Sequence, residues 1–124
     1  VLGGAEAIVT SSSDEKLERA ADLGASGTVN YRRSNELSDE VLDLTGGRGV
    51  DIAFDSVGGA TWPTDLSVLK KGGTVVNCGV TTGAEARTNL HQLYWNQLSA
   101  LGSTLASKGE FLQFLRTLLL MEAS

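Results

Sequence analysis

The chain has very little of several residue types on which particular protein classes depend. It contains one cysteine, one histidine and one proline among 124 residues. The single Cys78 excludes an internal disulfide, which suits a reducing compartment. The single His91 cannot form a zinc site with one distant cysteine, so the sequence shows no metal site. No serine lies in a nucleophile elbow, which leaves hydrolase chemistry without support.

Long apolar runs and excess positive charge are also missing. The longest uninterrupted apolar run covers only residues 118–121, far too short for a membrane span. The formal net charge of -5 argues against nucleic acid or an anionic membrane as a partner, because both attract basic surfaces. No leader-like segment opens the sequence. These features predict a cytoplasmic protein that binds neither nucleic acid nor membrane.

What the chain does contain is a repeating order of strands and helices. Hydrophobic residues make up 41% of it, enough for a single core, and its 15 glycines suit many tight joints between strands and helices. Apolar runs predict strands at residues 7–10, 28–30, 50–57, 74–80 and 98–104. Helical periodicity fills the intervals between these strands and continues after the last one. This alternation predicts an α/β fold with a parallel sheet and helices on both faces.

Several helix ends carry recognisable signals. Ser12 and Glu15 have the spacing of a capping box before the first helix, and Gly24 is well placed to end it. The Lys-Lys-Gly-Gly sequence at 70–73 is expected to end the third helix, with its cations on the negative end of the dipole. The last helix is predicted within residues 107–118 from a second capping box and an apolar stripe. We also expect Cys78 to be a small buried apolar group and His91 to be a surface or packing histidine.

Five short motifs occur in an order and spacing typical of one protein superfamily. They are residues 27–32 (GTVNYR), 44–51 (LTGGRGVD), 54–59 (FDSVGG), 69–73 (LKKGG) and 101–104 (LGST). Together they resemble the medium-chain dehydrogenase/reductase superfamily, and within it the branch of quinone oxidoreductases and zinc-type alcohol dehydrogenase-like proteins. The resemblance spans nearly all of residues 5–120. It implies a Rossmann-type doubly wound parallel sheet that binds a nicotinamide dinucleotide.

One signature of that fold is absent. A Rossmann unit holds the pyrophosphate on a Gly-rich turn between its first strand and first helix, but no G-x-G-x-x-G occurs here. By the family pattern, residues 1–4 correspond to the tail of that first helix. We therefore expect residues 1–124 to be part of a cofactor-binding domain from a larger two-domain enzyme, lacking the first strand and its loop. Rossmann order puts that strand between residues 7–10 and 50–57. We therefore expect either two half-sheets with unsatisfied inner edges or two halves that pair directly with each other.

The end of the first predicted strand bears on the type of cofactor. Domains that prefer NAD usually carry an acidic residue there, which repels the 2′-phosphate of NADP. Here Ser11, Ser12 and Ser13 follow the strand, and hydroxyl groups at a helix start form an anion site. Lys16 lies one turn further and can pair with a phosphate. The resemblance adds Tyr31, because NADP-dependent quinone oxidoreductases pair a lysine and a tyrosine at these two positions around the 2′-phosphate.

These residues also have a plainer interpretation, which is a capped surface helix with a solvated lysine and a tyrosine packed at a strand end. Of the two, we favour NADP(H) binding. Ligands of open parallel sheets bind at the carboxyl ends of the strands, so Ser56 and Val57 are expected to face the cofactor. The alternative there is a strand-to-helix turn that simply needs glycine. The resemblance implies further contacts near the nicotinamide, mainly through backbone atoms, at Gly79, Val80, Thr81 and Ser103.

No catalytic residue is named in this chain. Asp51 and Asp55 lie on one face of a strand but about 13 Å apart, too far to share a proton. The resemblance assigns substrate binding and any zinc to the missing catalytic domain. It also implies a homodimer, joined through the edge strand from Leu98 to Thr104.

The leading functional hypothesis is an oxidoreductase that transfers hydride between NADP(H) and a small-molecule quinone, enone, aldehyde or alcohol. An S-adenosylmethionine-dependent methyltransferase is an alternative, since similar strand–Asp–Gly–helix patterns occur in its sheets. A Rossmann binding module without enzyme activity is a third.

Overall fold

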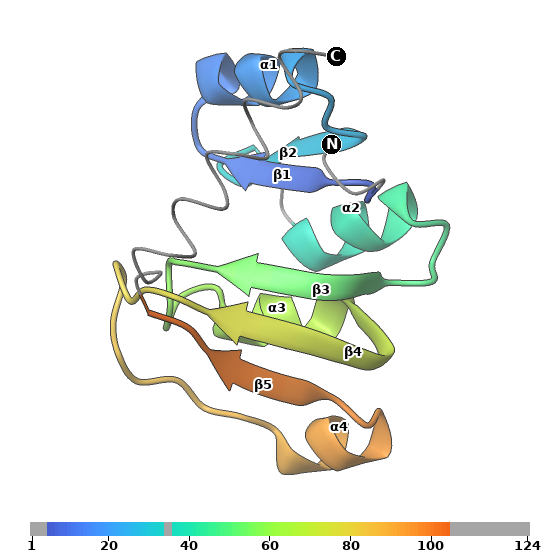
Figure 1. The fold of residues 1–124 in the computed structure, drawn as a ribbon, viewed down its shortest axis with the longest axis vertical. Coiled ribbons are helices and arrows are strands. Elements are labelled where there is room, and N and C mark those ends of the chain that lie inside the picture. The colour runs from blue at the N-terminus through green and yellow to red at the C-terminus, as the bar shows by residue number, and fades with distance from the viewer. Residues whose placement is uncertain (1–4, 34–35, 105–124) are drawn as a thin grey trace, which may run out of the picture.

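A computed structural model of the chain describes residues 5–33 and 36–104. Strands and helices alternate along these residues as the sequence predicts (Figure 1). In chain order the elements are β1 (Ile8–Ser11), α1 (Asp14–Asp22), β2 (Gly27–Asn30), α2 (Leu37–Leu44), β3 (Val50–Asp55), α3 (Trp62–Val68), β4 (Leu69–Asn77), α4 (Leu90–Trp95) and β5 (Ser99–Gly102). The helix predicted within 107–118 lies outside the described residues.

The strands form two parallel sheets. One sheet pairs β1 with β2, and the other has the order β3-β4-β5. All five arrows point the same way in Figure 1, yet within the described residues no pairing joins β1 to β3. The sheet is therefore divided between β1 and β3, which is the first of the two expected arrangements. The expected α/β class with parallel strands is confirmed.

A groove of about 910 Å³ lies between the two half-sheets. Both β1 and β3 line it, and so do apolar side chains of α2, which are Leu37, Val41 and Leu44. On β3, Ile52 and Phe54 are 64% and 72% exposed. Strands of a parallel sheet are normally buried on both faces. The groove is thus the place where Rossmann order calls for one more strand.

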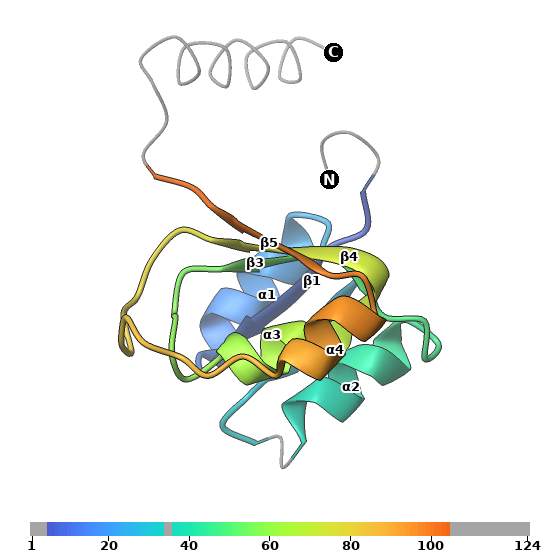
Figure 2. The same cartoon turned by 90° about the horizontal axis from the view of Figure 1, so that it is seen from below.

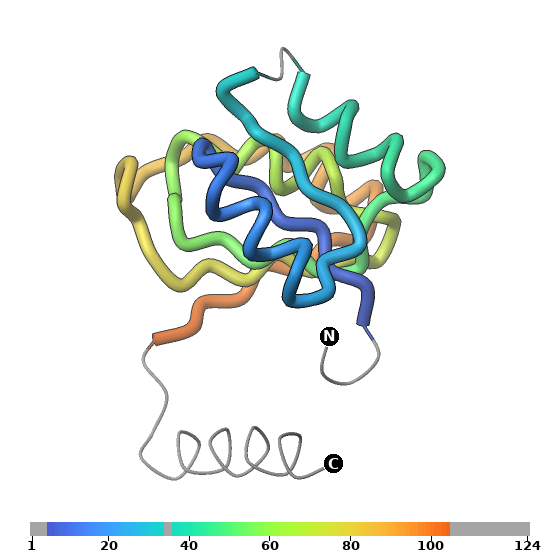
Figure 3. Tube along the Cα trace, turned by 90° about the horizontal axis from the view of Figure 1, so that it is seen from above, coloured from blue at the N-terminus to red at the C-terminus, as the bar shows by residue number. Residues whose placement is uncertain are grey.

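The helices α2, α3 and α4 lie on one side of the β3-β4-β5 sheet (Figure 2). Its core there is built around the fully buried Val75, with Leu66 and Leu69 packed beside it. On the opposite face Phe54, Val76 and Leu101 stand in one cross-strand row. At the opposite end of the molecule from β5 (Figure 1), α1 packs on β1 and β2, and their blue and cyan trace lies nearest the viewer in the view from above (Figure 3).

The prediction that residues 70–73 end the third helix is wrong. Helix α3 ends at Val68, and Leu69 already has extended backbone and begins β4. Leu69 is buried in the core, which favours the strand over another helical turn. The four residues 70–73 then lie opposite the single residue Asp51 in a register irregularity. The Lys70 ammonium forms an ion pair with Asp51 instead of meeting a helix end.

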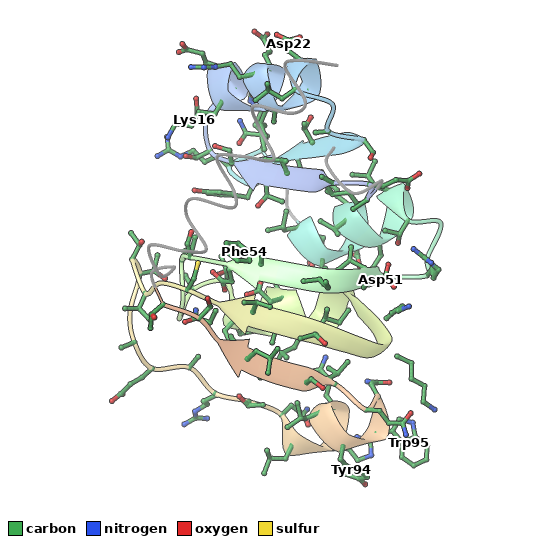
Figure 4. All side chains as sticks on the ribbon, in the orientation of Figure 1. Lys16, Asp22, Asp51, Phe54, Tyr94 and Trp95 are labelled. Atoms are coloured by element: carbon green, nitrogen blue, oxygen red, sulfur yellow. The ribbon has the colours of Figure 1, made fainter. Side chains whose placement is uncertain are left out.

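The sequence also predicts how exposed His91 and Cys78 are. His91 is a surface residue, as predicted, and its ring stacks on Trp95 with a centroid distance of 5.8 Å. The labelled Tyr94 and Trp95 in Figure 4 mark this exposed aromatic face of α4. Cys78 is exposed, which contradicts the prediction of a buried thiol, because β4 ends at Asn77. Within the described part of the chain, no helix is long and apolar enough to cross a membrane.

Two glycines of the turn before β3 offer a matched test of this packing. Both have positive φ, but a Cβ on Gly49 would lie 2.7 Å from the Lys70 nitrogen, whereas a Cβ on Gly46 meets nothing within 4 Å. We predict that Gly49→Ala lowers the free energy of unfolding by about 1–3 kcal/mol more than Gly46→Ala does, because backbone must move. Urea unfolding of both variants measures this. Equal losses would contradict the close contact between this turn and β4.

Candidate functional site

The carboxyl ends of all five strands lie along one edge of the molecule, on the left in Figure 1. The residues predicted to contact the cofactor follow these strand ends in the chain. Figure 4 shows Lys16 on this side and Asp51 at the other end of β3. The candidate site is built from two groups of residues, one on each half-sheet.

The first group begins with Ser11, the last residue of β1, and the two serines that follow it. The Ser13 amide donates to Ser11 Oγ at 3.1 Å, and Ser13 Oγ accepts from the Lys16 amide at 3.3 Å. Ser13 has the extended backbone of an N-cap residue, so the predicted cap at Ser12 with Glu15 is wrong by one residue. The Ser11 and Ser13 hydroxyls therefore both accept hydrogen bonds from backbone amides at the start of α1.

Tyr31 joins this group across the β1-β2 sheet. Its amide donates to the Ser11 carbonyl at 3.2 Å, and its side chain is 44% exposed. Lys16 is exposed in the first turn of α1, and no ion pair between described residues involves it. Hydrogen bonds thus connect Tyr31 to Ser11 and Ser13 to the Lys16 amide at this corner of the β1-β2 sheet.

An ion pair at this corner was missed by the sequence analysis. The Asp14 carboxylate accepts from Asn30 Nδ2 at 2.9 Å and pairs with the Arg33 guanidinium. The hydrogen bond from Asn30, together with the charge of Arg33, holds the pKa of Asp14 below its ordinary value. The nearest acid is therefore ionised but already matched by a cation. The run Asn30-Tyr31-Arg32-Arg33 is the only signal in the sequence that could have indicated it.

The second group consists of two loops that follow β3 and β4. Thr81 Oγ1 donates to the Ser56 carbonyl at 3.2 Å. The Val57 carbonyl accepts from both the amide and the hydroxyl of Thr82, each at 2.8 Å. A Cβ on Gly79 would lie 2.7 Å from the Ser56 oxygen, so only glycine fits there without a shift. Four of these five residues are among the predicted site residues, and Thr82 is not.

The buried carboxylate of Asp55 organises the first of these loops. Its Oδ1 accepts from the amides of Val57 at 2.6 Å and Gly58 at 3.1 Å. Its Oδ2 accepts from Thr61 Oγ1 at 2.7 Å, at the start of α3. Burial raises the pKa of Asp55, but hydrogen bonds from Asp65, Thr61 and the two amides outweigh it and hold that pKa below the ordinary value. Asp55 is therefore ionised at neutral pH.

The partner of Asp55 is a second carboxyl group, Asp65 of α3. Burial, followed by the hydrogen bond and the negative charge of Asp55, raises the pKa of Asp65 to about 8. Oδ2 of Asp65 is buried and has no donor facing it among the described residues. A protonated Asp65 resolves this, because it donates to Asp55 instead of requiring a donor. Asp51, which the sequence analysis compared with Asp55, pairs instead with Lys70 and Arg48 at the surface.

A cleft of about 340 Å³ opens beside the second group. Gly58, Asn77, Val80 and Gly102 contribute to its wall, so it touches the ends of β3, β4 and β5. Asn77 connects these ends, because its side chain donates to the Gly79 carbonyl at 2.9 Å and its carbonyl accepts from the Ser103 amide at 2.9 Å. Val80 is half exposed at this cleft. Ser103 is the residue that directly follows β5. The two groups of predicted residues remain on separate half-sheets.

Comparisons with known proteins agree on one family. The sequence pattern described as "Zinc-binding dehydrogenase" matches residues 1–119. A quinone oxidoreductase of Salmonella typhimurium is 38% identical over 104 residues, which cover 84% of this chain and 31% of that protein. The chain thus spans about a third of the length of its curated relatives.

Solved structures agree on the fold. The crystal structure of an NAD-dependent alcohol dehydrogenase has a TM-score of 0.85 and 38% identity, covering 94% of this chain and 34% of that one. A crotonyl-CoA carboxylase/reductase variant in complex with NADP has a TM-score of 0.77 and 25% identity, covering 84% of this chain and 31% of that one.

The hydrogen bonds of Asp55 lead to a stability prediction. We expect Asp55→Ala to lower the free energy of unfolding by roughly 3–5 kcal/mol, because it leaves buried donors and Asp65 without an acceptor. Asp51→Ala, at an exposed ion pair that solvent screens, is the control and is expected to cost far less. Urea unfolding at pH 6 compares them. Similar losses for the two variants would show that Asp55 does not hold the loop.

Proposed function

The chain belongs to the zinc-binding dehydrogenase family of the medium-chain dehydrogenase/reductase superfamily, and on that basis we propose that it is the NADP(H)-binding part of an oxidoreductase. The complete enzyme transfers hydride between NADP(H) and a small-molecule quinone, enone, aldehyde or alcohol. The nicotinamide supplies or accepts the hydride, while this chain binds and orients the cofactor. Residues 1–124 form only part of the cofactor domain in this proposal.

The preference for NADP(H) rests on the corner at the end of β1. Serine hydroxyls stand where NAD-preferring domains carry a carboxylate. The nearest acid, Asp14, is held by Asn30 and Arg33. Lys16 is exposed at this corner and can pair with a 2′-phosphate, while the Tyr31 hydroxyl can donate to it.

The relatives do not decide between the two dinucleotides. One similar structure is of an NAD-dependent alcohol dehydrogenase, and another is in complex with NADP. The choice for this chain is therefore argued from its own residues. The single observation that carries it is the run of serine hydroxyls at the end of β1, beside an Asp14 that is held by Asn30 and Arg33.

The rest of the dinucleotide is proposed to follow the loops after β3 and β4. Ser56 is exposed and Val57 is half-buried there, and Gly79 lets the two loops approach closely. The cleft beside Val80, with Ser103 near its rim, has room for part of a flat ring system. Backbone amides and carbonyls at its edge can orient such a ring.

Zinc is not assigned to this chain. Among the described residues no three potential metal ligands lie together, so the residues present do not fit a zinc site. In this proposal any zinc and the catalytic acid or base belong to the part of the enzyme outside residues 1–124. The single Cys78 supports a reducing, cytoplasmic location.

The two alternative functions now differ in their support. The family is one of dehydrogenases, which leaves the methyltransferase alternative without support. A binding module without activity differs from an oxidoreductase in one measurable respect, which is turnover. NADPH oxidation by the full-length protein with a panel of quinones, enones and aldehydes separates the two.

The edge strand β5 is proposed to join two copies of the protein. It pairs only with β4 among the described strands, and all four of its residues are exposed. An open strand edge presents unpaired backbone groups to a second copy. We expect sedimentation equilibrium of the full-length protein to give the mass of a dimer. A monomer at micromolar concentration would contradict the proposed role of β5.

Lys16 provides the direct test of cofactor preference. In the full-length protein, we expect Lys16→Ala to weaken NADPH binding about tenfold and to leave NADH binding unchanged, because only NADPH carries the phosphate that the ammonium pairs with. Arg19→Ala, one turn further along α1 and also exposed, is the matched control. Isothermal titration calorimetry measures all four affinities. An unchanged preference for NADPH in the Lys16 variant would show that this assignment is wrong.

A further inference from the structure

The proposed function does not use the carboxyl group of Asp65. This group lies next to Asp55, which holds the loop after β3 in place. Asp55 already accepts from Val57, Gly58 and Thr61. Asp65 lies one helical turn after Thr61, whose carbonyl accepts from the Asp65 amide at 2.9 Å, and its carboxyl group is within reach of a hydrogen bond to Asp55. Two ionised carboxylates cannot make such a bond, because neither has a proton to donate. The proton belongs on Asp65, since Asp55 is surrounded by donors and Asp65 Oδ2 faces none within the described part of the chain.

We propose that Asp65 is a positioning residue, which donates its carboxyl proton to Asp55 and thereby holds residues 56–58 in the shape that receives the cofactor. This inference rests on the proposed function, which assigns Ser56 and Val57 to the cofactor. The chain of contacts is direct. Asp65 donates to Asp55, and Asp55 accepts from the amides of Val57 and Gly58, whose positive φ of 92° sets the turn.

The surroundings of Asp65 make its protonation respond to pH near neutrality. The elements α2, β3 and β4 pack against α3. Their titratable and charged side chains are Asp39, Glu40, Asp43, Asp51, Asp55, Lys70 and Lys71. Only Asp55 interacts with Asp65, while Lys70 is paired with Asp51. Within the described part of the chain, no cation therefore compensates the second charge when Asp65 ionises.

The sign of the effect follows from the direction of the pKa shift. The pKa of Asp65 in the folded protein is about 8, above its ordinary value of 3.8. The contribution of this contact to stability is thus complete below about pH 4 and is lost as the pH rises through 8. Above that pH the donor is gone and two carboxylates repel each other. The Asp55 carboxylate then no longer holds the Val57 and Gly58 amides in place, and the loop loosens.

Substitution by asparagine separates this role from simple packing. The side-chain amide introduced by Asp65→Asn can donate to Asp55 at every pH, whereas Asp65→Ala removes the donor at every pH. We would measure NADPH affinity by fluorescence at pH 6 and pH 9 in the full-length protein. The set comprises the wild type, Asp65→Asn, Asp65→Ala and the control Asp43→Asn, an exposed carboxyl on the neighbouring α2.

The wild type and the Asp43 control are expected to lose up to about tenfold more affinity between pH 6 and pH 9 than Asp65→Asn does, the limit for one proton over one pH unit above its pKa. Asp65→Ala is expected to bind weakly at both pH values. The pH dependence of the cofactor itself is common to all variants. Equal pH dependence in the wild type and Asp65→Asn would overturn the inference.

Failure of the proposed function has a different signature, because the wild type would then bind neither NADPH nor NADH at either pH. Urea unfolding at the same two pH values still tests whether Asp65 donates a proton to Asp55. A loss of stability toward pH 9 in the wild type and the Asp43 control, but not in Asp65→Asn, supports it. Parallel losses in all three overturn it. If Asp65→Ala does not fold, the other three proteins suffice for both measurements.

Discussion

The buried carboxylate of Asp55 is the constraint on which the candidate site depends. It is only 4% exposed, and a buried anion is stable only when donors surround it. Two amides, one hydroxyl and the Asp65 carboxyl converge on it, which fixes the turn after β3 and the start of α3 at once. The loop after β4 is in turn hydrogen-bonded to that turn through Thr81 and Thr82. One side chain thus sets the geometry of both loops.

The division of the sheet sets the second condition for function. The phosphate corner lies on the β1-β2 sheet, whereas the two loops lie on the β3-β4-β5 sheet. A dinucleotide bound as proposed spans the groove between β1 and β3. Its binding therefore depends on the two half-sheets being held at a fixed separation. The full-length protein is therefore the form in which NADPH affinity is to be measured.

Local sequence patterns predicted the strands and helices well, but they could not predict the side-chain contacts between different elements. The alternation of apolar runs and helical stripes was enough to find every described strand and helix. The order of family motifs further predicted where the sheet divides. The Asp14–Arg33 pair and the Asp55–Asp65 pair were missed, because each joins residues from different elements. At residues 70–73 two lysines suggested a helix end, but burial of Leu69 decided the backbone.

Amide hydrogen exchange of the full-length protein with and without NADPH tests the central claim most directly. If the cofactor spans both half-sheets, NADPH slows exchange at Tyr31 after β2 and also at Val57 and Gly58 after β3. Slower exchange on only one sheet, or no change at these amides, would contradict a dinucleotide site built from both.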